Sequence, residues 1–134
     1  MRQALYAVSL VVSDYDAAIA FYCGTLGWEL AEDIPQDSEH GPKRWVRIVP
    51  PGSGDTRASL ILARARGRRQ TAAIGDQFGG RVGLFLQTDD FARDHAAMRA
   101  KGVHFEEQPR HEPYGTVAVW QDPFGNRWDL LELR

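Results

Sequence analysis

The order of the predicted elements, which occurs twice, is the strongest constraint on the fold. Each half of the 134-residue chain reads as a strand, a helix and three further strands. A glycine follows the helix in each half, and these two glycines, Gly27 and Gly102, are 75 residues apart. A period of this length in two copies indicates a duplicated module rather than a solenoid of many short repeats. The sequence therefore predicts a single α+β domain of two tandem βαβββ modules.

The first module begins with a β-rich run over residues 5–12, and Asp14 then supplies a helix-start signal. Apolar side chains at helical spacing follow, and this predicted helix ends at Gly27, a residue suited to positive φ. The remaining strands of the module are expected at residues 28–33, 44–49 and 58–63.

The second module repeats this order. A strand over 81–88 leads to Asp90 at the start of a helix over 91–101, which Gly102 ends. The stretch PRHEPYG, residues 109–115, is expected to be a loop that could close over a cleft. The remaining strands are expected at residues 103–108, 115–121 and 126–132.

Residues 64–80 are predicted to link module one, about 4–63, to module two, about 81–134. Four arginines of this linker, Arg64, Arg66, Arg68 and Arg69, favour a solvated loop over an anion or nucleic-acid patch, because no aromatic side chains interleave with them. A net charge of −2 gives no global field that attracts nucleic acid or an anionic membrane. No apolar run approaches a membrane span and the amino terminus lacks a signal pattern, so a cytoplasmic protein is expected.

Three stretches carry a family resemblance. They are VSLVVSDYDAAIAFYCGTLGWEL in the first module, and TDDFARDHAAMRAKGV with DPFGNRWDLLE in the second. In these stretches and their order, the chain resembles the vicinal oxygen chelate superfamily, which includes glyoxalase I, bleomycin-resistance proteins, fosfomycin-resistance proteins and extradiol dioxygenases. The resemblance implies the glyoxalase/bleomycin resistance fold, a curved mixed sheet around a cleft with the helices packed outside.

The resemblance also implies four inner-strand positions that hold a divalent ion in metal-using members of the family. Carried over residue by residue, these positions fall on Ala7, Ile61, Gly83 and Asp129, and a one-residue difference would move the third to Val82. Only Asp129 carries a ligand oxygen, whereas a catalytic divalent ion generally needs about three protein ligands and an open position. The sequence therefore predicts no cofactor and no metal ligand set.

A divalent metal would require an unusual set of ligands. The candidates are Asp129, Gln87, His104 or His111, and Glu132, which has the opposite strand parity from Asp129. The other two histidines are interpreted differently, since His40 falls in a polar loop and His95 lies on the helix stripe that meets the sheet.

Strand alternation selects the side chains expected to line the cleft. In the first strand, Val8, Leu10 and Val12 form an aliphatic face that belongs under a helix, so the more mixed face is turned to the cleft. The complete predicted ligand-binding cleft consists of Ala7, Ser9, Trp45, Arg47, Ile61, Gly83, Phe85, Gln87, Tyr114, Asp129 and Leu131.

An ionised carboxylate such as Asp129 in a partly dry cleft is costly unless it is paired or hydrogen-bonded. Arg47, Arg127, Gln87 or a cationic group on a ligand are the expected partners. Two other interpretations stay open: a purely structural ion pair, and a raised pKa with a general acid or base role.

The leading hypothesis for function is a metal-independent small-molecule-binding protein of the glyoxalase/bleomycin resistance type, which sequesters an antibiotic or metabolite. Aromatic side chains with a few placed polar groups suit such ligands. The alternative is a metal-dependent lyase or extradiol-type dioxygenase with an atypical ligand set. A third class is a subunit whose sheet edges serve only assembly. The resemblance further implies a homodimer, with no nucleic-acid or membrane partner expected.

Overall fold

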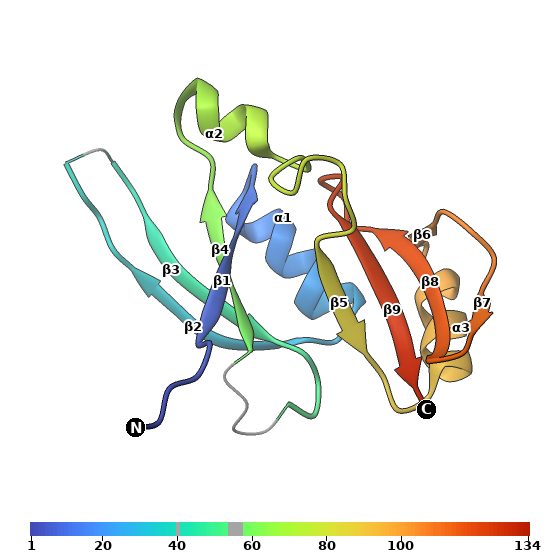
Figure 1. The fold of residues 1–134 in the computed structure, drawn as a ribbon. Coiled ribbons are helices and arrows are strands. Elements are labelled where there is room, and N and C mark those ends of the chain that lie inside the picture. Colours follow the sequence, from blue (N-terminus) through green and yellow to red (C-terminus); the bar gives the residue numbers. More distant parts are fainter. Residues whose placement is uncertain (40, 54–57) are drawn as a thin grey trace. The chain divides into compact units, whose positions relative to one another are not determined.

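The computed structural model describes residues 1–39, 41–53 and 58–134, so that His40 lies outside the described residues. The chain divides into two compact units, Met1–Ile74 and Gly75–Arg134. Each unit contains a mixed β-sheet with a helix packed against it, so the fold is α+β as predicted (Figure 1). None of the helices in the described part of the chain has the length and apolar composition that a membrane crossing requires.

Unit 1 contains a four-stranded sheet in the order β1-β4-β3-β2. Strand β1 pairs with β4 in parallel, and the other neighbours are antiparallel. The elements are β1 (Ala7–Val12), α1 (Tyr15–Ile19), β2 (Glu29–Pro35), β3 (Arg44–Val49), β4 (Ser59–Arg64) and α2 (Gly67–Ala73).

The first predicted helix changes from an α-helix to a π-helix part of the way along. It is α-helical only over α1 and continues as the π-helix η1 (Ala20–Thr25), in which Leu26 N donates to Phe21 O at 3.0 Å. The wider turn accompanies packing of the fully buried Tyr22 ring against Trp28, with ring centroids 5.2 Å apart. The expectation of one continuous α-helix is therefore wrong.

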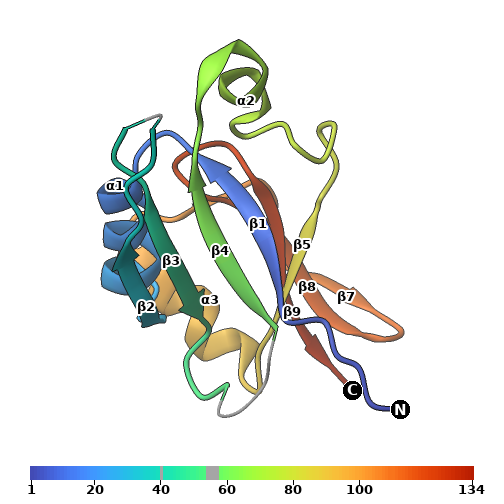
Figure 2. The same cartoon turned by 90° about the vertical axis from the view of Figure 1, so that its left-hand side faces the viewer.

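The core of unit 1 lies between the sheet and α1 (Figure 2). Five apolar side chains on the helix side of β1, β3 and β4 are fully excluded from solvent, or nearly so. Alternation with period two places them all on one face, which confirms the expected aliphatic face of the first strand at its last two positions. These residues are Leu10, Val12, Val46, Ile48 and Leu62.

The predicted linker is not simply a loop, because it contains the helix α2. The side chain of Gln70 accepts a hydrogen bond from Arg66 N at 2.9 Å, which satisfies a backbone donor at the start of the helix. Thr71 Oγ1 donates back to Gly67 O at 2.8 Å. None of the α2 residues is buried, so the segment is exposed as expected but has a different backbone conformation.

Unit 2 contains a five-stranded sheet in which β5, β9, β8 and β6 follow in that order and β7 pairs with β8 (Figure 1). Strand β5 is parallel to β9, which matches the parallel pair of unit 1. The elements are β5 (Leu84–Gln87), α3 (Phe91–Ala100), β6 (His104–Phe105), β7 (Arg110–Glu112), β8 (Gly115–Gln121) and β9 (Arg127–Leu133).

Two segments of unit 2 differ from expectation. Strand β6 is shorter than the predicted 103–108, because the Glu107 side chain, rather than a backbone carbonyl, accepts from Val119 N at 2.9 Å. Residues 109–115 are not only a loop, since β7 forms a tight hairpin with β8 around Pro113 and Tyr114. Gly115 closes this hairpin at φ 148°, where a side chain would clash with Glu132.

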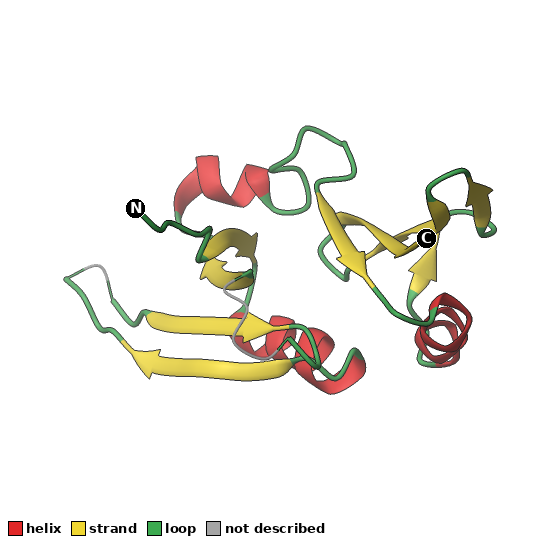
Figure 3. Cartoon of the chain, turned by 60° about the horizontal axis from the view of Figure 1, so that its bottom comes forward, coloured by secondary structure: helices red, strands yellow, loops and turns green. Residues whose placement is uncertain are grey.

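The core of unit 2 lies between its sheet and α3, the helix that lies beside these strands (Figure 3). Trp120 and Trp128 pair across β8 and β9 and stack with ring centroids 5.1 Å apart and planes 12° apart. Leu130 beside them is fully buried, and Phe91 and Met98 from α3 are also buried.

The DPFGN stretch is a tight turn that joins β8 to β9. Asp122 Oδ1 accepts from the backbone N of Phe124 and of Asn126, both at 2.9 Å, and its Oδ2 accepts from Asn126 Nδ2 at 2.8 Å. Gly125 adopts φ 96°, a conformation that favours glycine. Asp122 and Asn126 are 4% and 1% exposed, so these hydrogen bonds satisfy groups that water does not reach.

We expect Asp122→Ala to lower the free energy of unfolding by about 3 kcal/mol, because it leaves buried donors of the turn without an acceptor. Urea denaturation would measure this change. Asp89→Ala is the matched control, since the Asp89 side chain is 87% exposed and its ion pair with Arg93 should contribute less than about 1 kcal/mol. Equal losses in the two variants would contradict this account of the turn.

Candidate functional site

The open face of the unit 1 sheet brings together five of the predicted cleft residues. Ser9 of β1 pairs with Ile61 of β4, which pairs with Arg47 of β3, so the three side chains form one row. Ala7 lies at the β1 end of the next row, beside Ser59. Trp45 lies two residues from Arg47 on β3 and therefore shares this face.

Arg47 belongs to a polar cluster on this face that the sequence did not reveal. Its Nε donates to Glu32 Oε1 at 2.6 Å, and its guanidinium carbon lies 5.2 Å from the centre of the Tyr6 ring. The Tyr6 hydroxyl donates to the same Glu32 oxygen at 3.3 Å. The hydrogen bond from Arg47 holds the pKa of Glu32 below its usual value. Glu32 faces Arg47 only because the β2–β3 register shifts after Leu30, and no local sequence signal marks that shift.

The open face of the unit 2 sheet brings together four more of the predicted residues. Phe85 of β5 pairs with Asp129 of β9, which pairs with Val119 of β8. In the adjacent row, Gln87 pairs with Leu131. The neighbours of Asp129 along β9, Trp128 and Leu130, point into the core on the other side of the sheet. The alternation of the strand therefore explains why an acidic residue lies between two apolar residues in the sequence.

Asp129 is the most unusual polar group on this face. Its Oδ1 is buried and has no hydrogen-bond partner among the described residues. Burial raises the pKa of the Asp129 carboxyl, and the nearby Glu107 carboxylate raises it further. The positive charges of Arg110 and Arg127 act in the opposite direction without cancelling the effect.

The two arginines expected to pair with Asp129 are engaged elsewhere. Arg127 donates through Nε and Nη2 to the carboxylate of Glu106, each at 2.8 Å, and through Nη1 to Gly80 O at 2.9 Å. Arg47 is held by Glu32 in the other unit. The interpretation of Asp129 as one half of a structural ion pair is therefore wrong for both arginines.

Gly83, the third carried-over metal position, is covered by an aromatic ring. A Cβ atom built on Gly83 would collide with three ring carbons of Phe78. The Gly83 backbone is not in the positive-φ region, so the ring, and not the backbone conformation, is what excludes a side chain. Phe78 was not predicted as a site residue, because its contact with Gly83 depends on the path of a loop that carries no strand or helix pattern.

The donor set does not fit a divalent metal ion of the family type. Ala7 and Ile61 offer only hydrocarbon side chains, and the space beside Gly83 holds the Phe78 ring. Throughout residues 1–39, 41–53 and 58–134, no three His, Cys, Asp or Glu side chains are grouped closely enough to hold a metal ion.

The unusual ligand set considered from the sequence is divided between two faces of the unit 2 sheet. His104 pairs with Gln121 on the face that carries Asp129. His111 pairs with Thr116 on the opposite face, and its Nδ1 lies 3.3 Å from Thr116 Oγ1. Glu132 also faces away, where it accepts from Phe91 N at the start of α3. Tyr114 is exposed at the tip of the β7–β8 hairpin.

Sequence comparison relates nearly the whole chain to one family. Residues 4–130 match the family model described as the Glyoxalase/Bleomycin resistance protein/Dioxygenase superfamily. An uncharacterized protein of Shewanella frigidimarina is 50% identical over 133 residues, which cover 99% of this chain and 96% of that protein. The uncharacterized protein YurT of Bacillus subtilis is 26% identical over 128 residues, 96% of this chain and 98% of YurT.

Solved structures give the same fold. TnmS3, described as an antibiotic binding protein from Streptomyces sp. CB03234, superposes with a TM-score of 0.78 at 32% identity, covering 99% of this chain and 98% of TnmS3. UcmS2 gives a TM-score of 0.81 at 29% identity, covering 98% of each chain. A superfamily member from Sphaerobacter thermophilus gives 0.73 at 26% identity, again over 98% of each chain.

We expect Gly83→Ala to lower the free energy of unfolding by about 1–3 kcal/mol, because the added methyl group collides with the Phe78 ring. In a Phe78→Ala background the same substitution should cost far less, and urea denaturation of the four proteins in this double-mutant cycle measures the coupling. Gly24→Ala is the control, since a Cβ there meets nothing within 4 Å. Additive losses would show that the ring does not fill the Gly83 position.

We expect the stability difference between Asp129→Asn and the wild type to depend on pH in a defined direction. Because the folded-state pKa of Asp129 is raised, folding binds a proton between the unfolded and folded pKa values, and wild-type stability falls as the pH rises through that window. The variant should therefore gain stability relative to the wild type from acidic to neutral pH.

The control for this titration is Asp94→Asn. Hydrogen bonding from Arg93 lowers the pKa of Asp94, so this carboxylate stabilises the fold above its unfolded pKa. The Asp94 variant should accordingly lose stability relative to the wild type over the same pH rise. Urea denaturation at a series of pH values tests both, and parallel profiles for the two variants would refute the assignment for Asp129.

Proposed function

Because the chain belongs to the Glyoxalase/Bleomycin resistance protein/Dioxygenase superfamily, we propose that it is a metal-independent small-molecule-binding protein of the bleomycin resistance type. The ligand is an antibiotic or metabolite with a planar, largely apolar body and a hydrogen-bond donor or cationic group. Binding sequesters this compound, and side chains alone recognise it.

One observation carries the metal-independent part of the proposal. The Phe78 ring occupies the space that a ligand side chain at residue 83 would need. With hydrocarbon side chains at residues 7 and 61 as well, the four family positions retain one carboxylate, at residue 129. A single carboxylate is far from the three or four ligands that hold a catalytic ion tightly. The other three family positions offer a ligand only apolar contacts, from Ala7, Ile61 and the Phe78 ring beside Gly83.

The chemistry of the two open faces supports binding of an amphipathic ring system. Phe85 is 64% exposed on the unit 2 face, where a large aromatic side chain gains from being covered by a ligand. Directly across from it, the buried Oδ1 of Asp129 can accept a hydrogen bond. The unit 1 face, considered by itself, carries the aromatic side chain of Trp45 on the same strand as Arg47. Aromatic walls with a few polar groups are typical of small-molecule sites.

The relative TnmS3, described as an antibiotic binding protein, supports an antibiotic as the ligand class. The proposal also retains two expectations from the sequence, a homodimer and a cytoplasmic location. A metal-dependent lyase or extradiol-type dioxygenase is the alternative that the experiment below separates from binding alone.

We expect chelator-treated protein to bind 9-aminoacridine more tightly than acridone or acridine-9-carboxylate, as measured by titration calorimetry. The three probes share one ring system and differ in charge, so the order tests the contribution of the Asp129 carboxylate. Asp129→Asn should remove the preference for the cation. Phe85→Ala should weaken all three probes by about tenfold, through loss of about 1–2 kcal/mol of aromatic contact.

Leu30→Ala is the control for general loss of hydrophobic surface, because Leu30 is an exposed apolar residue whose strand partner, Ile48, belongs to the core side of the unit 1 sheet. It should leave all three affinities unchanged. Binding that appears only after a divalent transition metal is restored would overturn the proposal in favour of the metal-dependent alternative. Absence of binding to every member of a broader panel of planar antibiotics and metabolites would also overturn it.

A further inference from the structure

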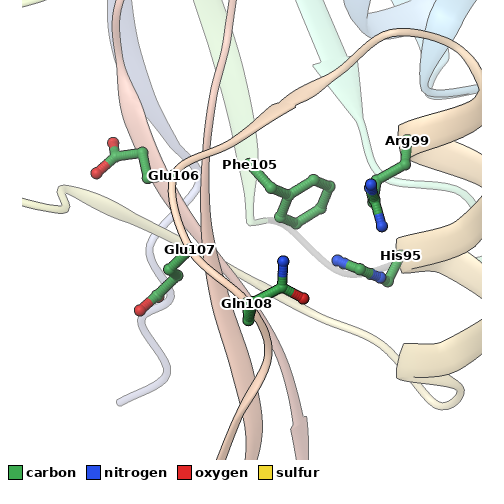
Figure 4. Close-up of a pocket in the computed structure, with 6 residues that line it drawn as sticks. All are labelled: His95, Arg99, Phe105, Glu106, Glu107 and Gln108. Carbon is green, nitrogen blue, oxygen red and sulfur yellow. The ribbon is translucent and has the colours of Figure 1, made fainter.

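A separate pocket lies on the helix side of the unit 2 sheet, away from the face that carries Asp129. It has a volume of about 320 Å³ and lies between α3 and the segment that follows β6 (Figure 4). This volume is at the lower end of the range for small-molecule sites. The residues that line it are His95, Arg99, Phe105, Glu106, Glu107 and Gln108.

The two acidic residues of the lining turn their carboxylates away from the pocket (Figure 4). Glu106 is held by Arg127, through two hydrogen bonds of 2.8 Å, and by Gln121. Glu107 is held by Arg110 and by the backbone N of Val119. Both negative charges are therefore committed to partners outside the pocket.

The side chains that point into the pocket are hydrogen-bond donors of positive or neutral charge. Arg99 and His95 project from successive turns of α3, and the Gln108 amide points toward them from the opposite wall (Figure 4). Within the described ranges, no carboxylate forms an ion pair with Arg99. The charge of Arg99 adds to burial in lowering the pKa of His95. Two basic groups thus lie close together without a counter-charge.

An aromatic wall accompanies these donors. The His95 ring stacks on Phe91 with centroids 5.3 Å apart and planes 14° apart, and it meets Phe105 edge-on at 4.5 Å. The Phe105 ring lines the pocket directly (Figure 4). His95 is therefore fixed in orientation by packing, as interpreted from the sequence, while it still borders the pocket.

We propose that this pocket binds a small aromatic carboxylate, with Arg99 as the anchor for the carboxylate, His95 and Gln108 as further donors, and Phe105 as the surface against which the ring packs. An anion supplies the missing counter-charge, and a guanidinium binds a carboxylate through a planar pair of hydrogen bonds. The aromatic part is favoured because the pocket offers ring surfaces beside the donors. This site is independent of the one proposed above, because it lies on the opposite side of the unit 2 sheet.

Titration of the isotope-labelled wild-type protein with benzoate, followed by NMR, tests the proposal. The resonances of His95, Arg99 and Gln108 should shift and saturate with a Kd on the order of 1 mM, as befits a small ligand in a half-open pocket. Arg99→Gln should weaken benzoate by at least about tenfold, and Arg99→Lys should restore part of the loss. Arg99 is exposed, so both variants should retain the fold.

Three comparisons make the result decisive. Arg68→Gln, which removes an exposed arginine from α2, should leave benzoate affinity unchanged. Cyclohexanecarboxylate and inorganic phosphate should bind several-fold more weakly than benzoate, since one lacks the aromatic face and the other lacks any apolar part. Equal affinity for all three anions, an Arg99→Gln variant that behaves like Arg68→Gln, or shifts that do not saturate would each overturn the proposal. None of these results depends on binding of acridines at the other face.

Discussion

The parallel pairing of the first and last strands of each module is the constraint on which the other features depend. β1 can lie parallel to β4, and β5 to β9, only if the chain crosses over between them, and a helix forms part of each crossover. That helix covers one face of its sheet, where apolar side chains of β1, β3 and β4 in unit 1, and of β8 and β9 in unit 2, are buried. The other face receives the alternate residues and no helix of its own unit. Ser9, Ile61 and Arg47 in unit 1, and Phe85 and Asp129 in unit 2, lie on the face away from the helix for this single geometric reason.

The changes at the family's metal positions are consistent with one another. At Gly83, which the family resemblance aligns with a metal ligand, the space that a side chain would need is occupied by the Phe78 ring. The Asp129 carboxyl pairs across the sheet with the apolar residues Phe85 and Val119, and burial raises its pKa. Arg127 does not compensate, because Glu106 and the Gly80 carbonyl already hold its guanidinium. A ligand with a hydrogen-bond donor could satisfy Asp129 Oδ1, which has no partner among the described residues, while it packs against Phe85 beside it.

The parts of the fold that were predictable from the sequence depend on local periodicity. The strands at 44–49 and 115–121 have the predicted bounds, and both helix starts are confirmed, since Asp14 and Asp90 each cap a helix with a side-chain hydrogen bond. These features depend on residues close in sequence. The failures depend on contacts that no strand or helix period predicts. The bulge before Glu32 places that residue opposite Arg47, and the Phe78 ring reaches Gly83 from a loop; neither contact leaves a periodic pattern in the sequence.

The short strand β6 connects the two proposed sites electrostatically. Where β6 ends, the Glu107 side chain accepts a hydrogen bond from Val119 N. The Glu107 carboxylate then lies near enough to Asp129 to raise the pKa of the Asp129 carboxyl. In the segment after β6, the carboxylates of Glu106 and Glu107 point away from the pocket beside α3, so Arg99 and His95 have no carboxylate partner there among the described residues. The hydrogen bond from Val119 N to Glu107 therefore affects the position of charged groups on both sides of the unit 2 sheet. Because the two proposed ligands differ in charge, a cation beside Asp129 and a carboxylate beside Arg99, a single small molecule would not compete for both proposed sites.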